Sequence, residues 1–404
     1  MAHQSARELD AARTPGSSAL ETALLAFLLA WPLLIWAFTH ERAPWGDEEH
    51  YLATVQLFGR GLSLDLLRSY PEMTAPLTFL VYGAWGHIAG FDTPSLRLLS
   101  VCLSWAAAST WWLVLRLECG RTPWTIGALA LLVLNPYFVG LSIFVFTDML
   151  ALCGLALTAL GVSRDRPWLV AAGVGMATLT RQYLVFLVPA VALADMLRRS
   201  GRRGRLLTAS AAGLLPLAAL VVLWGVSLSP DNSLRRDYLF GGLRFDPHAL
   251  SLYVSLPGLY LLPLMLPRLA RTSWRVWALA APLAATVWLF TIEPSAAQLR
   301  EGRTTVGFLH KALTASLPPV FVTAVFWAGA TCGLAWAISA APRAWQQWRA
   351  ARNQPAAGFP WMAAAAFLLV MPFSYLPWEK YALPLLMLVT VMVARVESRR
   401  ADAA

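Results

Sequence analysis

The chain has 404 residues, of which 58% are hydrophobic and 13% charged, and its formal net charge is +10. A soluble protein carries about 25% charged residues, so this composition excludes an ordinary soluble domain and predicts an all-α polytopic membrane protein. The basic excess does not indicate nucleic-acid binding, because thirty of the 32 basic residues are Arg and they cluster between apolar runs, as in cytoplasmic loops. Four cysteines stand singly, which predicts neither a zinc site nor a disulfide framework.

Twelve apolar runs are predicted to cross a membrane as helices. In chain order they cover residues 19–39, 95–115, 123–140, 141–162, 167–180, 183–197, 206–226, 249–266, 274–291, 317–340, 359–376 and 381–395. The N-terminus is polar to about Ser18 and the next run is long enough to span, so no cleavable signal peptide is expected. A further apolar stretch at 76–90 is interrupted by two glycines and a histidine, and we assign it to a membrane-surface helix.

Arginine placement predicts the orientation of these spans. With the N-terminus inside, the segments on the inner face hold most of the basic residues, although the outer loops are longer. The run RRSGRRGR at 198–205 is the strongest anchor. We therefore expect an N-in, C-in protein of a bacterial plasma membrane. It would have a cytoplasmic tail at 1–18, one transmembrane domain at 19–395 with an outer loop at 40–94, and a second tail at 396–404.

That outer loop opens with the stretch GDEEHY, which places three acids where the first span ends. The simpler interpretation is that these acids only end the span. Acids contribute little to membrane orientation, so a row of three indicates a further role. A carboxylate beside a low-dielectric wall can have its pKa raised and serve as a general base. We predict Asp47 and Glu48 to be catalytic, with Asp47 as the base, while Glu48 and His50 orient it or the acceptor. Tyr51 follows Asp47 by four residues, on the same helix face.

Three more polar residues stand near the predicted outer face. Asp148 lies about two turns into a span, where a carboxylate is costly and usually functional; a structural carboxylate with a partner is the alternative. Arg181 and Gln182 lie between two spans. A guanidinium there can bind a lipid phosphate through two hydrogen bonds, or it can simply extend to the interface.

These segments, in this order, resemble the GT-C superfamily of membrane glycosyltransferases. GDEEHY is similar to the first-loop element of the protein O-mannosyltransferase and aminoarabinose transferase families. The stretches MTAPLTFLVYG, NPYFVGLSIFVFTD, LTRQYLVF, FDPHALSLYVSLPGLY and LPWEKYALPL resemble segments of the Alg10 family of α-1,2-glucosyltransferases, which use dolichyl-phosphate glucose. One departure is that His50 stands three residues after Asp47, where the Alg10 family has four, so the acceptor does not carry over.

The resemblance implies a polyprenyl-phosphate sugar as donor and an inverting single displacement on the outer face. The sugar would be a hexose such as glucose or mannose, and the acceptor a hydroxyl of a lipid-linked glycan, polysaccharide or protein. The sequence offers no P-loop or dinucleotide fingerprint for a nucleotide donor. The cations available for the donor phosphate are Arg181, Arg235, Arg244 and Lys380, and the matching segments add His248 and Glu379 as substrate-binding candidates.

No cofactor is expected to be required. Three nearby carboxylates, Asp47, Glu48 and Asp148, would suit Mg²⁺ or Mn²⁺, and this is a weaker prediction. Two functions outside catalysis fit the same composition. A secondary transporter would place its site near mid-membrane between two repeats, and no such repeat is evident. A noncatalytic lipid-binding subunit would keep the basic residues but would not need Asp47.

Overall fold

The computed structural model describes residues 15–198, 203–230, 244–300, 302–350, 354–374 and 376–401, and within these ranges the regular structure is helical throughout. The helices are α2 (Pro15–Thr39), α3 (Glu48–Arg60), α4 (Leu64–Arg68), α5 (Leu77–Ala89), α6 (Thr93–Cys119), α7 (Pro123–Val133), α8 (Pro136–Ile143), α9 (Asp148–Ser163), α10 (Pro167–Thr178), η1 (Gln182–Phe186), α11 (Leu187–Met196), α12 (Arg205–Leu223), α14 (Pro247–Tyr260), α15 (Leu262–Leu269), α16 (Trp274–Ala284), α17 (Thr286–Leu289), α18 (Ala296–Arg300), α19 (Phe308–Ser316), α20 (Pro319–Ala350), η2 (Pro355–Ala357), α21 (Phe359–Val370), η3 (Met371–Phe373), η4 (Glu379–Ala382) and α22 (Leu383–Ala401).

Five helices in the described part of the chain are long and apolar enough to cross a membrane, or seven spans if each of two bent pairs counts as one. This makes the chain a multi-pass membrane protein, but twelve full-length spans are not found. The other apolar helices have 10–17 residues. The shortest of them, α10, has 12 residues and so rises about 18 Å, against a hydrocarbon core of about 30 Å.

The two bent pairs correct the predicted boundaries. A run was expected to continue from residue 123 to 140, but α7 and α8 meet at an angle of 60°. Asn135 causes the break locally, because its side chain accepts from the backbone N–H of Tyr137 and Pro136 follows as the first helical residue. The second bend, of 77°, separates α14 from α15 within the predicted run at 249–266.

Small residues let the helices approach closely. A Cβ built on Gly173 of α10 would collide with the backbone of Thr158 in α9, and one built on Gly258 of α14 would collide with the carbonyl of Gly329 in α20. Contacts of this kind are typical of helix packing in membranes, where burial of apolar surface alone does not hold helices together.

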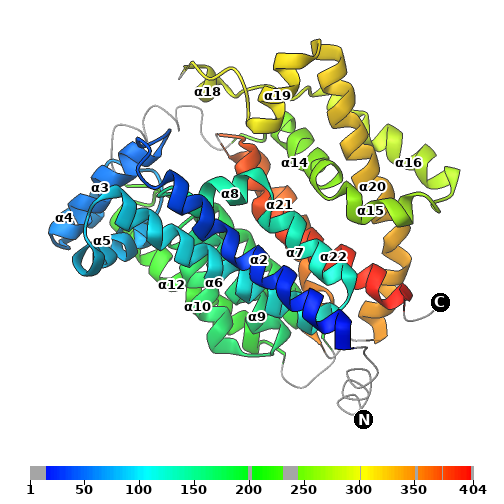
Figure 1. Ribbon diagram of the computed structural model, residues 1–404, viewed down its shortest axis with the longest axis horizontal. Helices are drawn as coiled ribbons and strands as arrows, with labels where there is room; N and C mark the ends of the chain where they lie inside the picture. Colours follow the sequence, from blue (N-terminus) through cyan, green and yellow to red (C-terminus); the bar gives the residue numbers. More distant parts are fainter. Residues whose placement is uncertain are drawn as a thin grey trace.

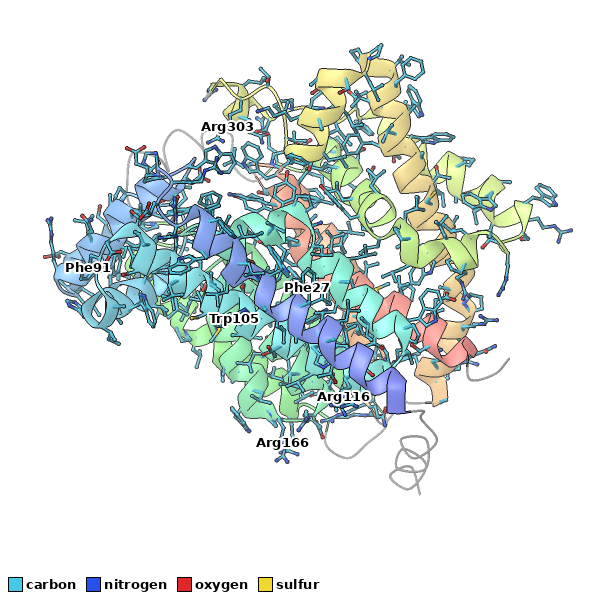
Figure 2. The ribbon with its side chains drawn as sticks, in the orientation of Figure 1. Phe27, Phe91, Trp105, Arg116, Arg166 and Arg303 are labelled. Carbon is cyan, nitrogen blue, oxygen red and sulfur yellow. The ribbon has the colours of Figure 1, made fainter. Side chains whose placement is uncertain are left out.

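Ion pairs gather at two opposite ends of the bundle. At one end they join segments predicted to lie inside, namely Arg198 with Asp165, Arg268 with Glu397 and Arg395 with Glu118. At the other end they join segments predicted to lie outside, namely Glu48 with Arg97, Asp148 with Arg181, and Asp47 with Lys380 and Arg303. Figure 2 shows Arg116 and Arg166 at the lower end and Arg303 at the upper end. The side of the membrane on which each end lies stays a prediction.

The end that carries Asp47 is built from short helices. In Figure 1, α3, α4 and α5 lie beside the upper end of α2, and α18 and α19 cover the top of the bundle near α14 and α20. Within 76–90 a helix is present as α5, and it packs on α3; its place at the membrane surface stays a prediction.

Candidate functional site

Arg97 fixes the loop that leads from α2 to α3. Its guanidinium donates to both carboxylate oxygens of Glu48, at 2.9 and 2.7 Å, and to the carbonyls of Thr39, His40, Arg42 and Ala43. Glu48 also accepts from the backbone N–H groups of Trp45 and Val145. Both charged side chains are almost completely buried. Every oxygen of Glu48 is therefore engaged in holding the turn, which leaves it no free lone pair aimed at a substrate.

Asp47 directly precedes Glu48 and is the N-cap residue of α3. Its carboxylate contacts Lys380 Nζ at 3.3 Å and Arg303 Nη2 at 3.4 Å, and 36% of the side chain is exposed. Aromatic rings support both cations. Lys380 lies over the ring of Phe146 at 5.1 Å, and Arg303 over that of Trp378 at 5.0 Å. Residues far apart in the sequence thus place one accessible carboxylate between two cations.

The pKa of Asp47 departs from the sequence-based expectation. Burial alone raises the pKa of this carboxyl, as predicted, but the charges of Lys380 and Arg303 outweigh burial and hold the pKa below its ordinary value. Asp47 is therefore ionised at neutral pH, as a general base must be before it accepts a proton. The predicted upward shift was wrong because the sequence did not reveal that two cations would fold against this residue.

Asp148 has a partner, and that partner is Arg181. Asp148 Oδ2 accepts from Arg181 Nη2 at 2.7 Å, and both side chains are at least nine-tenths buried. The guanidinium also lies over the ring of Tyr381, 5.3 Å from its centroid. Asp148 Oδ1 and Arg181 Nε have no hydrogen-bond partner among the described residues. The pair is neutral overall, which distinguishes Arg181 from the more exposed cations at Asp47.

Glu379 orders the segment that carries Arg303. Its carboxylate accepts from the hydroxyls of Tyr137 and Tyr260 and from the first N–H groups of α19, at Leu309 and His310. A carboxylate is favourable at a helix N-terminus because the N–H groups there lack partners within the helix. The backbone N–H of Glu379 also donates to Val306. With all these contacts, Glu379 is a structural tether, and its predicted direct contact with substrate has no geometric support.

Gln182 joins two loops beside the Asp148–Arg181 pair. Its side-chain amide donates to the carbonyl of Met73 at 2.9 Å and to that of Leu228 at 2.8 Å. Both loops border a cavity of about 420 Å³, which is lined also by Arg181, Gln182 and Tyr381. A volume in this range is typical of small-molecule sites.

The remaining predicted residues lie in different surroundings. Tyr51 follows Asp47 on the same face of α3, as predicted, but its buried ring packs between Phe79 and Phe146. His50 is exposed. The Nδ1 atom of His248 forms a hydrogen bond with the loop carbonyl of Thr291, which links the first turn of α14 to that loop.

The two further arginines proposed for the phosphate are placed as follows. Arg244 is exposed and lines the cavity, whereas Arg235 falls outside the described residues.

Glu72 is a functional candidate that the sequence did not reveal. It is 7% exposed, accepts from the hydroxyl of Thr54 at 3.2 Å, and immediately precedes Met73 at the cavity. Burial raises its pKa to about 7, and the negative charge of Asp47 contributes in the same direction. Its only sequence signal is a carboxylate within the segment SYPEMTAPL, five residues before the start of α5.

A divalent ion at Asp47, Glu48 and Asp148 stays a prediction. No group of three His, Cys, Asp or Glu side chains suited to a metal ion occurs in the described parts of the chain. Each of these three carboxylates has its own cation partner instead. The arrangement places an ionised carboxylate next to two cations, which can hold an anion.

No protein-family model and no curated protein sequence matches this chain. Two solved structures of ArnT from Cupriavidus metallidurans are similar to it. The apo structure has a TM-score of 0.42 and 16% identity, and the match covers 93% of this chain and 76% of that one. The structure bound to undecaprenyl phosphate has a TM-score of 0.41 and 15% identity, with 95% and 79% covered.

Proposed function

We propose that this protein is a membrane glycosyltransferase that moves a hexose from a polyprenyl-phosphate donor to an acceptor hydroxyl. The observation that carries the proposal is the position of Asp47, an ionised and partly exposed carboxylate in contact with both Lys380 and Arg303. The family resemblance of the segment around Asp47 supports it. The acceptor would be a lipid-linked glycan, a polysaccharide or a protein.

The two cations are suited to the donor phosphate. Their contacts with Asp47, at 3.3 and 3.4 Å, are longer than the 2.7 Å contacts of the buried pairs Glu48–Arg97 and Asp148–Arg181. A phosphate offers more acceptor oxygens than one carboxylate, and charge-assisted hydrogen bonds to it are strong. Lys380 and Arg303 would therefore stabilise the leaving phosphate. Arg181, the phosphate ligand expected from the sequence, is less suitable because Asp148 already neutralises it.

The proposed reaction is a single displacement. The acceptor oxygen forms a bond to the anomeric carbon while the bond from that carbon to the phosphate oxygen breaks, and the configuration inverts. The acceptor proton passes to Asp47, and the electron pair of the broken bond stays on the phosphate, next to Lys380 and Arg303. The protein contributes orientation and electrostatic stabilisation of the leaving group.

The proposed topology retains the predicted twelve crossings, with both termini inside and the site on the outer face of a bacterial plasma membrane. Five long helices, two bent pairs and five of the shorter apolar helices would make them up, and α5 would stay at the surface. Tilt, local thinning of the bilayer and contact with neighbouring helices accommodate short spans.

The test is a transfer assay on membranes, with a panel of polyprenyl-phosphate hexoses and lipid or glycan acceptors. Asp47→Asn keeps the shape of the side chain but removes its basicity, and transfer should fall by about a hundredfold to ten-thousandfold. Glu49→Gln is the matched control, because Glu49 is exposed on the same helix and should transfer normally. Near-normal transfer by Asp47→Asn would contradict the assignment of the base.

Divalent ions are proposed to be dispensable. Transfer by the wild-type protein should therefore survive an excess of EDTA. Loss of transfer in EDTA, restored by Mg²⁺ or Mn²⁺, would show that a metal ion shares the phosphate with Lys380 and Arg303. Absence of transfer from every donor of the panel would favour a noncatalytic lipid-binding protein or a transporter.

A further inference from the structure

The cavity beside Arg181 has three polar atoms in its lining residues that lack partners. Thr74 Oγ1, Ser229 Oγ and Arg181 Nε have no hydrogen-bond partner among the described residues, and each of the three side chains is more than nine-tenths buried. Buried polar groups are nearly always paired, and each unpaired one costs stability. These three atoms belong to residues that line one cavity, so a ligand in the cavity would complete their hydrogen bonds once the side chains turn toward it.

Hydrogen bonds to the backbone hold Thr74 and Ser229 in place. Tyr70 donates its hydroxyl to the carbonyl of Thr74 at 2.6 Å, and the backbone N–H of Ser229 donates to Ser227 at 3.3 Å. Gln182 bonds the carbonyls of Met73 and Leu228, the residues that directly precede Thr74 and Ser229. One amide nitrogen thus fixes the spacing of the two hydroxyl-bearing loops, as a preorganised binding site requires.

The unpaired atoms match the chemistry of a sugar ring. Two are hydroxyl oxygens, which both donate and accept, and the third is an N–H that only donates. A ring with several neighbouring hydroxyls presents the complementary pattern. The cavity of about 420 Å³ also has apolar and aromatic lining, including Val185, Phe373 and Tyr381, which suits the carbon–hydrogen faces of such a ring.

Charge in the cavity favours an uncharged sugar. Arg181 is neutralised by Asp148, and the carboxylate of Asp246 accepts from the backbone N–H of His248. The other charged lining residue in the described chain, Arg244, is exposed. The charges of the lining residues in the described chain thus balance, and no buried unpaired charge calls for a sugar that carries an amino or carboxylate group.

We infer that this cavity binds the transferred sugar as an uncharged hexose, through the hydroxyls of Thr74 and Ser229 and the Nε of Arg181. The inference rests on the proposed function, since it concerns the donor of that reaction. Arg181 and Tyr381 line the cavity and connect it to Lys380. The guanidinium of Arg181 and Nζ of Lys380 both lie over the ring of Tyr381, at 5.3 and 5.5 Å. The sugar would lie in the cavity, with the phosphate bonded to its anomeric carbon at the edge of the cavity next to Lys380.

Three single-hydroxyl variants test the inference. Thr74→Val and Ser229→Ala remove one proposed sugar contact each. Thr78→Val is the matched control, because Thr78 is equally buried and its hydroxyl is also unpaired in the described structure, yet it lies outside the cavity lining. All three variants should be at least as stable to heat as the wild type, since each loses an unpaired buried hydroxyl. This separates a binding defect from misfolding.

The donor KM for undecaprenyl-phosphate hexose should rise about two- to tenfold in Thr74→Val and in Ser229→Ala, the effect of one lost hydrogen bond, and should not change in Thr78→Val. Sugar-free undecaprenyl phosphate should inhibit all four proteins with the same Ki. Donors carrying an aminopentose or a uronic acid should be poorer than hexose donors for the wild type.

Unchanged donor KM values in both cavity variants, or a Ki that rises in step with KM, would overturn the inference while the proposed function stands. Preference for the charged sugars would do the same. If the wild type transfers no sugar from any donor, the proposed function fails. Equal affinity of the wild type and Thr74→Val for the hexose donor, measured directly in detergent, would then overturn the sugar site as well.

Discussion

The pair formed by Glu48 and Arg97 allows a sharp prediction about the acids that follow the first span. Glu48→Gln keeps the shape of the side chain and removes its charge, which leaves the guanidinium of Arg97 buried without a counter-charge. Removing one partner of a buried ion pair costs about 3–5 kcal/mol, and here the exposed fractions are 1% for Arg97 and 0% for Glu48. Because folded proteins are stable by only about 5–15 kcal/mol, the variant should unfold much more easily.

Arg97→Met should be more destabilising still. It removes the six hydrogen bonds to Glu48 and to the four carbonyls at the end of α2, and it leaves the carboxylate of Glu48 charged and buried. The double variant should cost less than the sum of the two single variants, since neither unpaired charge remains. Unfolding by denaturant in mixed micelles measures all three differences in the free energy of unfolding.

Sugar transfer by folded Glu48→Gln decides between a structural and a chemical role. Folded protein, isolated by size exclusion at low temperature, should retain transfer within about tenfold of the wild type, because Glu48 has no oxygen left for the reaction. The reasoning is refuted if Glu48→Gln unfolds like the wild type and yet transfers nothing. Glu48 would then be the base, and Asp47 its neighbour.

Three further predictions concern pH and topology. Lys380→Met should move the acidic limb of the kcat/KM profile to higher pH, because loss of this cation raises the pKa at which Asp47 becomes protonated and inactive; an unmoved limb would exclude Asp47 as the titrating base. Glu72→Gln should gain stability relative to the wild type as the pH rises from about 5 to 8. The reason is that the raised pKa of Glu72, about 7, makes the folded protein hold a proton that the unfolded chain releases nearer 4.5; parallel stability curves would contradict this. In a cysteine-free background, Leu62→Cys should react with an impermeant maleimide from outside and Arg164→Cys only after permeabilisation, and the reverse pattern would invert the topology.

The elements of the site that follow from local sequence were predictable. Asp47 precedes an amphipathic run that forms α3, and the helical spacing puts Tyr51 on its face. The position of Lys380 just before the last long apolar run identified it as a boundary cation, and the structure brings it to Asp47. In these cases the signal was a charged residue next to an apolar run, which composition and periodicity reveal without knowledge of the fold.

Ion pairs between residues far apart in the sequence were not predictable. Arg97 lies 49 residues from Glu48, and Arg303 lies 256 residues from Asp47. Nothing in the sequence around one residue of such a pair indicates which residue is its partner. The sequence therefore predicts a catalytic Glu48 and a phosphate contact for Arg181, whereas the structure gives each of them a buried partner. The apolar pattern likewise gave the positions of the helices but not the bends after α7 and α14, which depend on single capping and proline residues.

Burial separates the carboxylates that hold this protein together from the one that can react. Glu48, Asp148 and Asp195 each meet an arginine at 2.7 Å, with side chains no more than 7% exposed on either partner. A pair in this state is rigid and inaccessible, and its value is to fix the backbone on both sides. Asp47 meets its cations at longer distances, with 36% of its side chain exposed, and it sits on a turn that the Glu48–Arg97 pair holds still. A base needs both properties, since it must stay in position and yet offer an oxygen to a substrate proton. Two adjacent acids therefore have different roles. Glu48 fixes the backbone of the turn, and this keeps the accessible carboxylate of Asp47 in position to accept a proton.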